Sequence, residues 1–193
     1  MVVGAPALTR ALAAAALAAC AAVSSARAAP AGFAVDARCH DGRAQGPYQL
    51  RDARGQLRAS GAFDGGVRTG SFIFWRANGL RAAHVPYDDN GVRRGTVAMW
   101  YDGDPRHEAV QRLESAWRHG RREGEMRAWY PDGRRRARAD FTEGRLVKAE
   151  AWSQTGTRLP EDDARRVVLD VVREAETEYG ALDALIRRHM PPC

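Results

Sequence analysis

Glycines recur at a nearly fixed spacing through the middle of the chain and set the frame of an internal repeat. A second glycine follows each opening glycine after eight or nine residues, and a third series lies four residues before the next opening glycine. A repeat of this length is one supersecondary unit that must stack on its neighbours to bury a core. The opening glycines are Gly46, Gly70, Gly95 and Gly124, the second series is Gly55, Gly79, Gly103 and Gly133, and the third is Gly66, Gly91 and Gly120, with Gly144 and Gly156 extending the pattern.

Aromatic residues repeat within the same frame. A tryptophan follows three of the opening glycines by five residues, and Trp152 holds the corresponding place in a partial last unit, whereas Arg51 takes it in the first. A second aromatic column precedes the third glycine series. The first column is Trp75, Trp100, Trp129 and Trp152, and the second is Phe63, Tyr87, Trp117 and Phe141.

Alternation of apolar side chains within each unit predicts strands. Pairs such as Phe72 and Phe74, or Val97 and Met99, fall on one face of a strand, and the tryptophans of the first column fall on the other. Glycine with asparagine or aspartate between these runs is typical of tight turns. We therefore expect a mainly β fold, an elongated antiparallel sheet of about five stacked hairpins over residues 46–158.

Two units resemble the MORN-type repeat. Gly95 to Gly103 reads GTVAMWYDG and Gly124 to Gly133 reads GEMRAWYPDG, and the bacterial variant found in proteins named YwqK-type antitoxins is the most similar form. The resemblance implies an elongated sheet that serves as a contact surface for a protein or a membrane. The first unit departs from it by lacking a tryptophan, and the third is stretched between Gly103 and Gly120.

The residues after the repeats, 159–193, have a different period. Pro160 and the acidic residues 161–163 are typical of a helix start. Apolar residues then recur at steps of three and four, as an amphipathic helix requires, and Gly180 is expected to divide the helix into two segments. We expect a C-terminal helical cap that covers an exposed edge or face of the sheet.

The first 28 residues have the order of a signal peptide. Arg10 precedes a short apolar run, and Ala26-Arg27-Ala28 is a suitable cleavage site, so the mature chain is expected to begin at Ala29 with a linker over residues 29–45. This predicts a periplasmic or secreted protein. Leu17-Ala18-Ala19-Cys20 also resembles a lipobox, and lipidation at Cys20 would make the protein a membrane-anchored lipoprotein instead.

Export makes the remaining thiols candidates for oxidation. Cys39 and Cys193 are left near the two ends of the mature chain, and we expect a disulfide between them. Alternatively, Cys39 and Cys193 with His40 and His189 could supply four zinc ligands, or the thiols could be unpaired.

The formal net charge is +6, and Lys148 is the only lysine among the 30 basic residues. Arginines are densest at residues 134–138, as Arg134, Arg135, Arg136 and Arg138, where they could face an anionic surface. No nucleic-acid recognition motif accompanies this cluster, so we expect no nucleic-acid partner.

Motifs for catalysis are missing from the sequence. The chain has no nucleophile elbow, no zinc-protease motif and no phosphate loop. Asp104, His107 and Glu108 in the stretched third unit could form a metal or acid–base cluster, but a solvated loop is the commoner meaning of such an insertion. We expect neither enzymatic activity nor a cofactor.

Two classes of function follow from these features. The first is an exported scaffold that binds an envelope protein through the tryptophan column or the Arg-rich edge, although aromatic stripes at repeat spacing often belong to the core. The second is an adaptor on an anionic membrane surface, and the family resemblance adds an antitoxin or immunity-type role.

Overall fold

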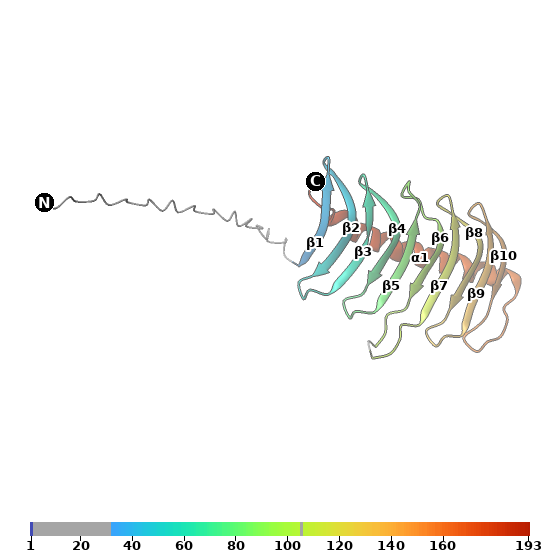
Figure 1. The fold of residues 1–193 in the computed structure, drawn as a ribbon. Coiled ribbons are helices and arrows are strands. Elements are labelled where there is room, and N and C mark those ends of the chain that lie inside the picture. The colour runs from blue at the N-terminus through green and yellow to red at the C-terminus, as the bar shows by residue number, and fades with distance from the viewer. Residues whose placement is uncertain (2–31, 105) are drawn as a thin grey trace.

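A computed structural model describes residue 1, residues 32–104 and residues 106–193. Ten strands follow one another in chain order, each antiparallel to the next, so the sheet is a continuous series of hairpins (Figure 1). One helix, α1 (Glu161–Arg188), follows the last strand. The mainly β fold with a C-terminal helix is therefore confirmed. The strands are β1 (Phe33–His40), β2 (Arg43–Asp52), β3 (Leu57–Asp64), β4 (Val67–Trp75), β5 (Arg81–Tyr87), β6 (Gly95–Trp100), β7 (Gln111–Arg118), β8 (Arg121–Trp129), β9 (Arg135–Thr142) and β10 (Arg145–Ala151).

The sheet begins earlier than the repeat pattern indicates. Residues 33–45, which we predicted to belong to a linker, form β1 and the start of β2, and this prediction is wrong. Phe33 and Val35 alternate with exposed residues and pack, partly buried, against the core, so β1 extends the inner face of the sheet beyond β2. The predicted signal peptide, its cleavage site and Cys20 lie outside the described residues.

The two faces of the sheet have different surroundings. The inner face is the one that α1 covers, and its large side chains, such as Phe72, Phe74 and Met126, are fully buried. The second aromatic column also belongs to this core, with Phe63 and Trp117 among its nearly buried members. The outer face has no described element packed over it (Figure 1). The first aromatic column lies on that outer face.

Helix α1 runs across the strands, and its length matches the width of the sheet. Its 28 residues span about 42 Å at 1.5 Å per residue, and ten strands at 4.8 Å make a sheet about 43 Å wide. Its ion pairs with the sheet run from the last strands toward the first: Arg136 of β9 binds Glu174, Arg112 of β7 binds Glu178, and Arg68 of β4 binds Asp183. No described helix is long and apolar enough to span a membrane.

The helix is continuous, so the predicted division at Gly180 is wrong. Glycine in a helix interior costs about 1 kcal/mol relative to alanine, too little to break a helix that is held on both sides. The hydroxyl of Tyr179 lies 3.0 Å from that of Tyr87, and Asp183 is bound to Arg68. Contacts between the helix and the sheet therefore outweigh the low helix propensity of Gly180. The helix does begin as predicted, with Pro160 as its N-cap.

A recurrent irregularity turns arginines toward the helix. At the start of each odd-numbered strand from β3 to β9, one residue has no partner in the preceding strand. Such a bulge alters the side-chain alternation. In β7 and β9 the extra residues are Arg112 and Arg136, and both reach carboxylates of α1. The irregularity thus supplies ion pairs to the helix without disturbing the outer face.

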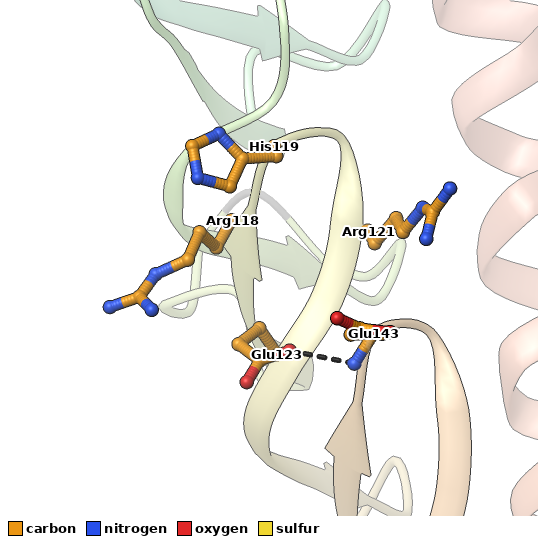
Figure 2. A pocket seen from close by; sticks show the side chains of 5 residues that line it. All are labelled: Arg118, His119, Arg121, Glu123 and Glu143. Atoms are coloured by element: carbon orange, nitrogen blue, oxygen red, sulfur yellow. Dashed lines mark hydrogen bonds between the residues drawn. The ribbon is translucent and has the colours of Figure 1, made fainter.

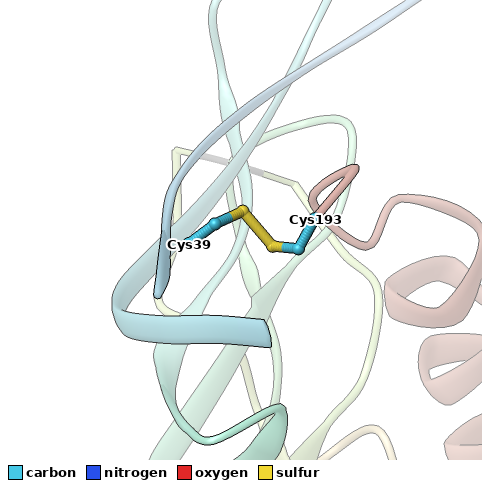
Figure 3. The surroundings of a disulfide bond; sticks show 2 residues. All are labelled: Cys39 and Cys193. Carbon is cyan, nitrogen blue, oxygen red and sulfur yellow. A yellow bond between two sulfur atoms is a disulfide. The ribbon is translucent and has the colours of Figure 1, made fainter. Parts of the chain in front are cut away.

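A disulfide between Cys39 and Cys193 joins the far end of the chain to the first strand (Figure 3). The Cα atoms of the two cysteines are 5.6 Å apart. Nearby, the Tyr48 hydroxyl donates to the carbonyl of His189 at 3.0 Å, and burial raises the pKa of Tyr48 to about 12. The helix is therefore connected to β10 through the chain and to β1 through the disulfide.

Candidate binding surface on the outer face

A line of side chains crosses the outer face at right angles to the strands, near the ends of β4 to β10. Tryptophans come from the even-numbered strands or directly follow them, and long polar side chains come from the odd-numbered strands between them. All four tryptophans are partly exposed. We call this set the outer row: Trp75, Arg81, Trp100, Gln111, Trp129, Arg135 and Trp152.

Each arginine of the outer row lies over the ring of the next tryptophan in the row. Arg81 is paired across the strands with Trp75, and its guanidinium carbon lies 5.1 Å from the ring centre of Trp100. The same arrangement recurs at the other end, where Arg135 is paired with Trp129 and lies 5.0 Å from the ring of Trp152. Such cation–π contacts hold indoles in place at a modest energy of about 0.5–1 kcal/mol at exposed sites. The row is therefore an ordered surface of alternating indole and polar groups.

A hollow of about 260 Å³ adjoins the outer row at Trp129. Its lining also includes Glu125 and three arginines, Arg127, Arg135 and Arg138. Glu125 binds both Arg127 and Arg138, and the hydrogen bond from Arg127 holds the pKa of Glu125 below its ordinary value. Arg135 forms no ion pair with the described residues. The hollow thus carries positive charge beside an aromatic ring, a combination suited to an anionic group.

The predicted arginine cluster does not form one patch. Arg136 lies on the inner face with Nη1 and Nη2 each 2.9 Å from Glu174. Arg135 belongs to the outer row, and Arg138 binds Glu125. Arg134 donates to the carbonyl of Gln154 at the turn edge. Arg135 and Arg138 therefore share the hollow at Trp129, whereas Arg134 and Arg136 lie elsewhere.

The structure assigns a role to arginines that sequence reasoning missed. Arg68, Arg93 and Arg122 lie between a third-series glycine and the next opening glycine, in the pattern Gly-x-Arg-x-Gly. All three point to the inner face, where Arg93 and Arg122 bind Glu176 and Arg68 binds Asp183. The spacing was a usable signal, because the same frame that places the tryptophans outward places these arginines inward.

The two ligand clusters that the sequence left open as alternatives do not form metal sites among the described residues. The zinc alternative needs two thiolates, but the sulfurs of Cys39 and Cys193 are bonded to each other. His189 instead packs on the ring of Phe33 at 4.5 Å between ring centres. In the stretched loop, Asp104 binds Arg106, and the His107 side chain is 79% exposed. No group of three or more potential metal ligands occurs within residues 32–104 and 106–193.

A second hollow, of about 340 Å³, lies at the hairpin turns between β7 and β8 and between β9 and β10. Figure 2 shows that its side chains diverge, with Arg118 and Arg121 pointing away from each other. The hydrogen bond marked there joins the Glu143 amide to Glu123 at 2.7 Å. These residues do not converge on a common point, so the outer row is the better candidate.

The chain matches no protein-family model, and no curated protein is significantly similar to it. The MORN-like resemblance of its repeats consequently stays a prediction.

Proposed function

We propose that this protein is an exported, non-catalytic scaffold of the cell envelope that binds another protein on its outer sheet face. One observation carries the proposal: the chain's own helix occupies the inner face, whereas the outer row crosses an uncovered face. Tryptophan and arginine are also the residues in which binding energy concentrates at protein interfaces. A binding role of this kind needs no catalytic group and no cofactor.

The disulfide supports export. Cys39 and Cys193 are joined, and such bonds persist in oxidising compartments outside the cytosol. This fits the predicted signal peptide over residues 1–28 and a periplasmic or secreted location. Action in the cytosol, which is expected of an antitoxin, does not fit an exported protein with a disulfide.

Crosslinking in the native envelope tests the proposal. A photoreactive amino acid replaces Gln111, which lies between Trp100 and Trp129, and crosslinked proteins are identified by mass spectrometry. The matched control carries the same group at Leu169, which is 49% exposed on α1. We expect a protein adduct specific to position 111 that is lost when Trp100→Ala is added.

The same experiment distinguishes the protein-binding scaffold from the membrane-adaptor alternative. Adducts confined to lipid, with binding to anionic vesicles that disappears at high salt, would replace the scaffold by an adaptor. Equal protein adducts at positions 111 and 169, or adducts indifferent to Trp100→Ala, would contradict a specific outer-row partner.

A further inference from the structure

The indoles of the outer row have a regular spacing. They come from every second strand position, so successive indoles are separated by two strand spacings, about 9.6 Å. Four indoles therefore define three equal intervals. An occupant that contacts all of them must present equivalent groups at that interval.

A polyproline II helix meets this requirement. It has three residues per turn and rises about 3.1 Å per residue, so the same side of the chain returns every 9.3 Å or so. A β-strand returns about every 6.7 Å and does not match. In an α-helix the same side returns after seven residues, about 10.5 Å, and this spacing departs from that of the indoles by roughly 3 Å over three intervals.

The chemistry of the indoles suits the same conformation. No indole N–H of the four outer-row tryptophans has a hydrogen-bond acceptor among the described residues. A polyproline II backbone has no internal hydrogen bonds, so its carbonyls are free to accept. Proline rings also pack well on aromatic side chains, as in known recognition of proline-rich segments.

The charge of the outer row further restricts which segment it can bind. The outer row contains Arg81 and Arg135 and no acidic residue. Neither arginine forms an ion pair within the part of the chain that the structure describes, and each stands between two indoles. We propose that the outer row binds an acidic, proline-rich segment of a partner protein in the polyproline II conformation. This rests on the proposed scaffold function and names its partner's chemistry.

Peptide titration tests this recognition with the full mature chain. The probe is a peptide of about five Pro-Pro-Glu triplets, long enough to pass all four indoles. Its controls are an equally charged, flexible Gly-Ser-Glu peptide and a Pro-Pro-Lys peptide of the same length. We expect calorimetric binding of the first peptide, weakened about tenfold or more for each control.

Variants locate the binding. Trp100→Ala and the double change Arg81→Gln with Arg135→Gln should each reduce affinity for the Pro-Pro-Glu peptide about tenfold, while Leu169→Ala leaves it unchanged. Trp100→Phe keeps a ring but removes the indole N–H, so it should give an intermediate loss. Circular dichroism confirms that each variant keeps its fold.

Three results would overturn the inference. Equal binding of the flexible acidic peptide would show that charge alone is recognised. Binding of a chitin hexasaccharide in place of the peptide would make the occupant a glycan. If neither acidic peptide binds, yet envelope crosslinks at position 111 still depend on Trp100, the scaffold function stands and the proline-rich partner falls.

Discussion

Nη2 of Arg122 in β8 lies 2.7 Å from Oε1 of Glu176 in α1, and Arg93 approaches the same carboxylate at 3.3 Å. Both guanidinium groups also stack on the ring of Trp117, at 4.7 Å and 3.6 Å from its centre. Burial lowers the pKa of Arg122, because the charged form loses water. The single carboxylate of Glu176 on the helix thus faces the positive charges of both Arg93 and Arg122.

Removing that carboxylate should weaken the attachment of the helix. We expect Glu176→Gln to lower the free energy of unfolding by about 2 kcal/mol, since Arg122 would stay nearly buried without its anion. Urea denaturation measures the change. Asp170→Asn removes a surface partner of Arg173 and should change stability by less than about 0.5 kcal/mol. Equal effects of the two substitutions would show that Glu176 has no special role.

The pair Arg136 and Glu174 predicts a dependence on pH. Its hydrogen bonds from Arg136 hold the pKa of Glu174 below the ordinary 4.5. A lowered folded-state pKa stabilises the protein fully above the unfolded value and loses that effect as pH falls through the folded one. The stability difference between the parent and Glu174→Gln should therefore be largest near neutral pH and shrink below about pH 4.5. With Arg136→Met as background, the pH dependence of this difference should become much smaller, and Arg112 accounts for what remains.

The disulfide should contribute strongly to stability, because it closes a loop with a sequence separation of 154 residues. The chain-entropy model gives an upper value of about 5 kcal/mol. Replacing Cys39 and Cys193 together with serine should lower the urea midpoint, and adding a reductant to the parent should have the same effect. A parent protein indifferent to reductant would contradict the bond. Hydrogen exchange should show β1 and the last turn of α1 opening first in the double variant.

Gly61 should not tolerate alanine. A Cβ at this position would lie 2.5 Å from the ring of Phe72, which is fully buried on the inner face. We expect Gly61→Ala to cost about 1–3 kcal/mol by overpacking, and Phe72→Leu to recover part of that loss in the double variant. Gly180→Ala is the matched control, because a Cβ there would have nothing within 4 Å and helical alanine should stabilise by about 1 kcal/mol. Thermal denaturation should show a lower melting temperature for Gly61→Ala and a higher one for Gly180→Ala.

Much of the fold follows from local patterns. The glycine and aromatic frame predicts the hairpins from β2 onward, since a strand's alternation and a turn's positive φ depend on adjacent residues. Gly120, for example, has a φ of +74° in the turn before β8, and a Cβ there would lie 3.0 Å from Val92. The helix start at Glu161 is equally local, because Pro160 and three acids mark it. The sequence favoured a bond between Cys39 and Cys193 over zinc ligation or free thiols, and the structure has that bond.

The sequence alone determined the repeat, the two sides of each strand and the presence of a helix after the last hairpin. Only the tertiary structure decided which face the helix covers, that Gly180 stays helical and that Arg136 turns inward while Arg135 remains in the outer row. The reason is physical: local periodicity fixes which side chains share a face, but long-range contacts decide which face is buried. Those contacts join residues such as Arg68 and Asp183, 115 positions apart, and no local pattern encodes their pairing.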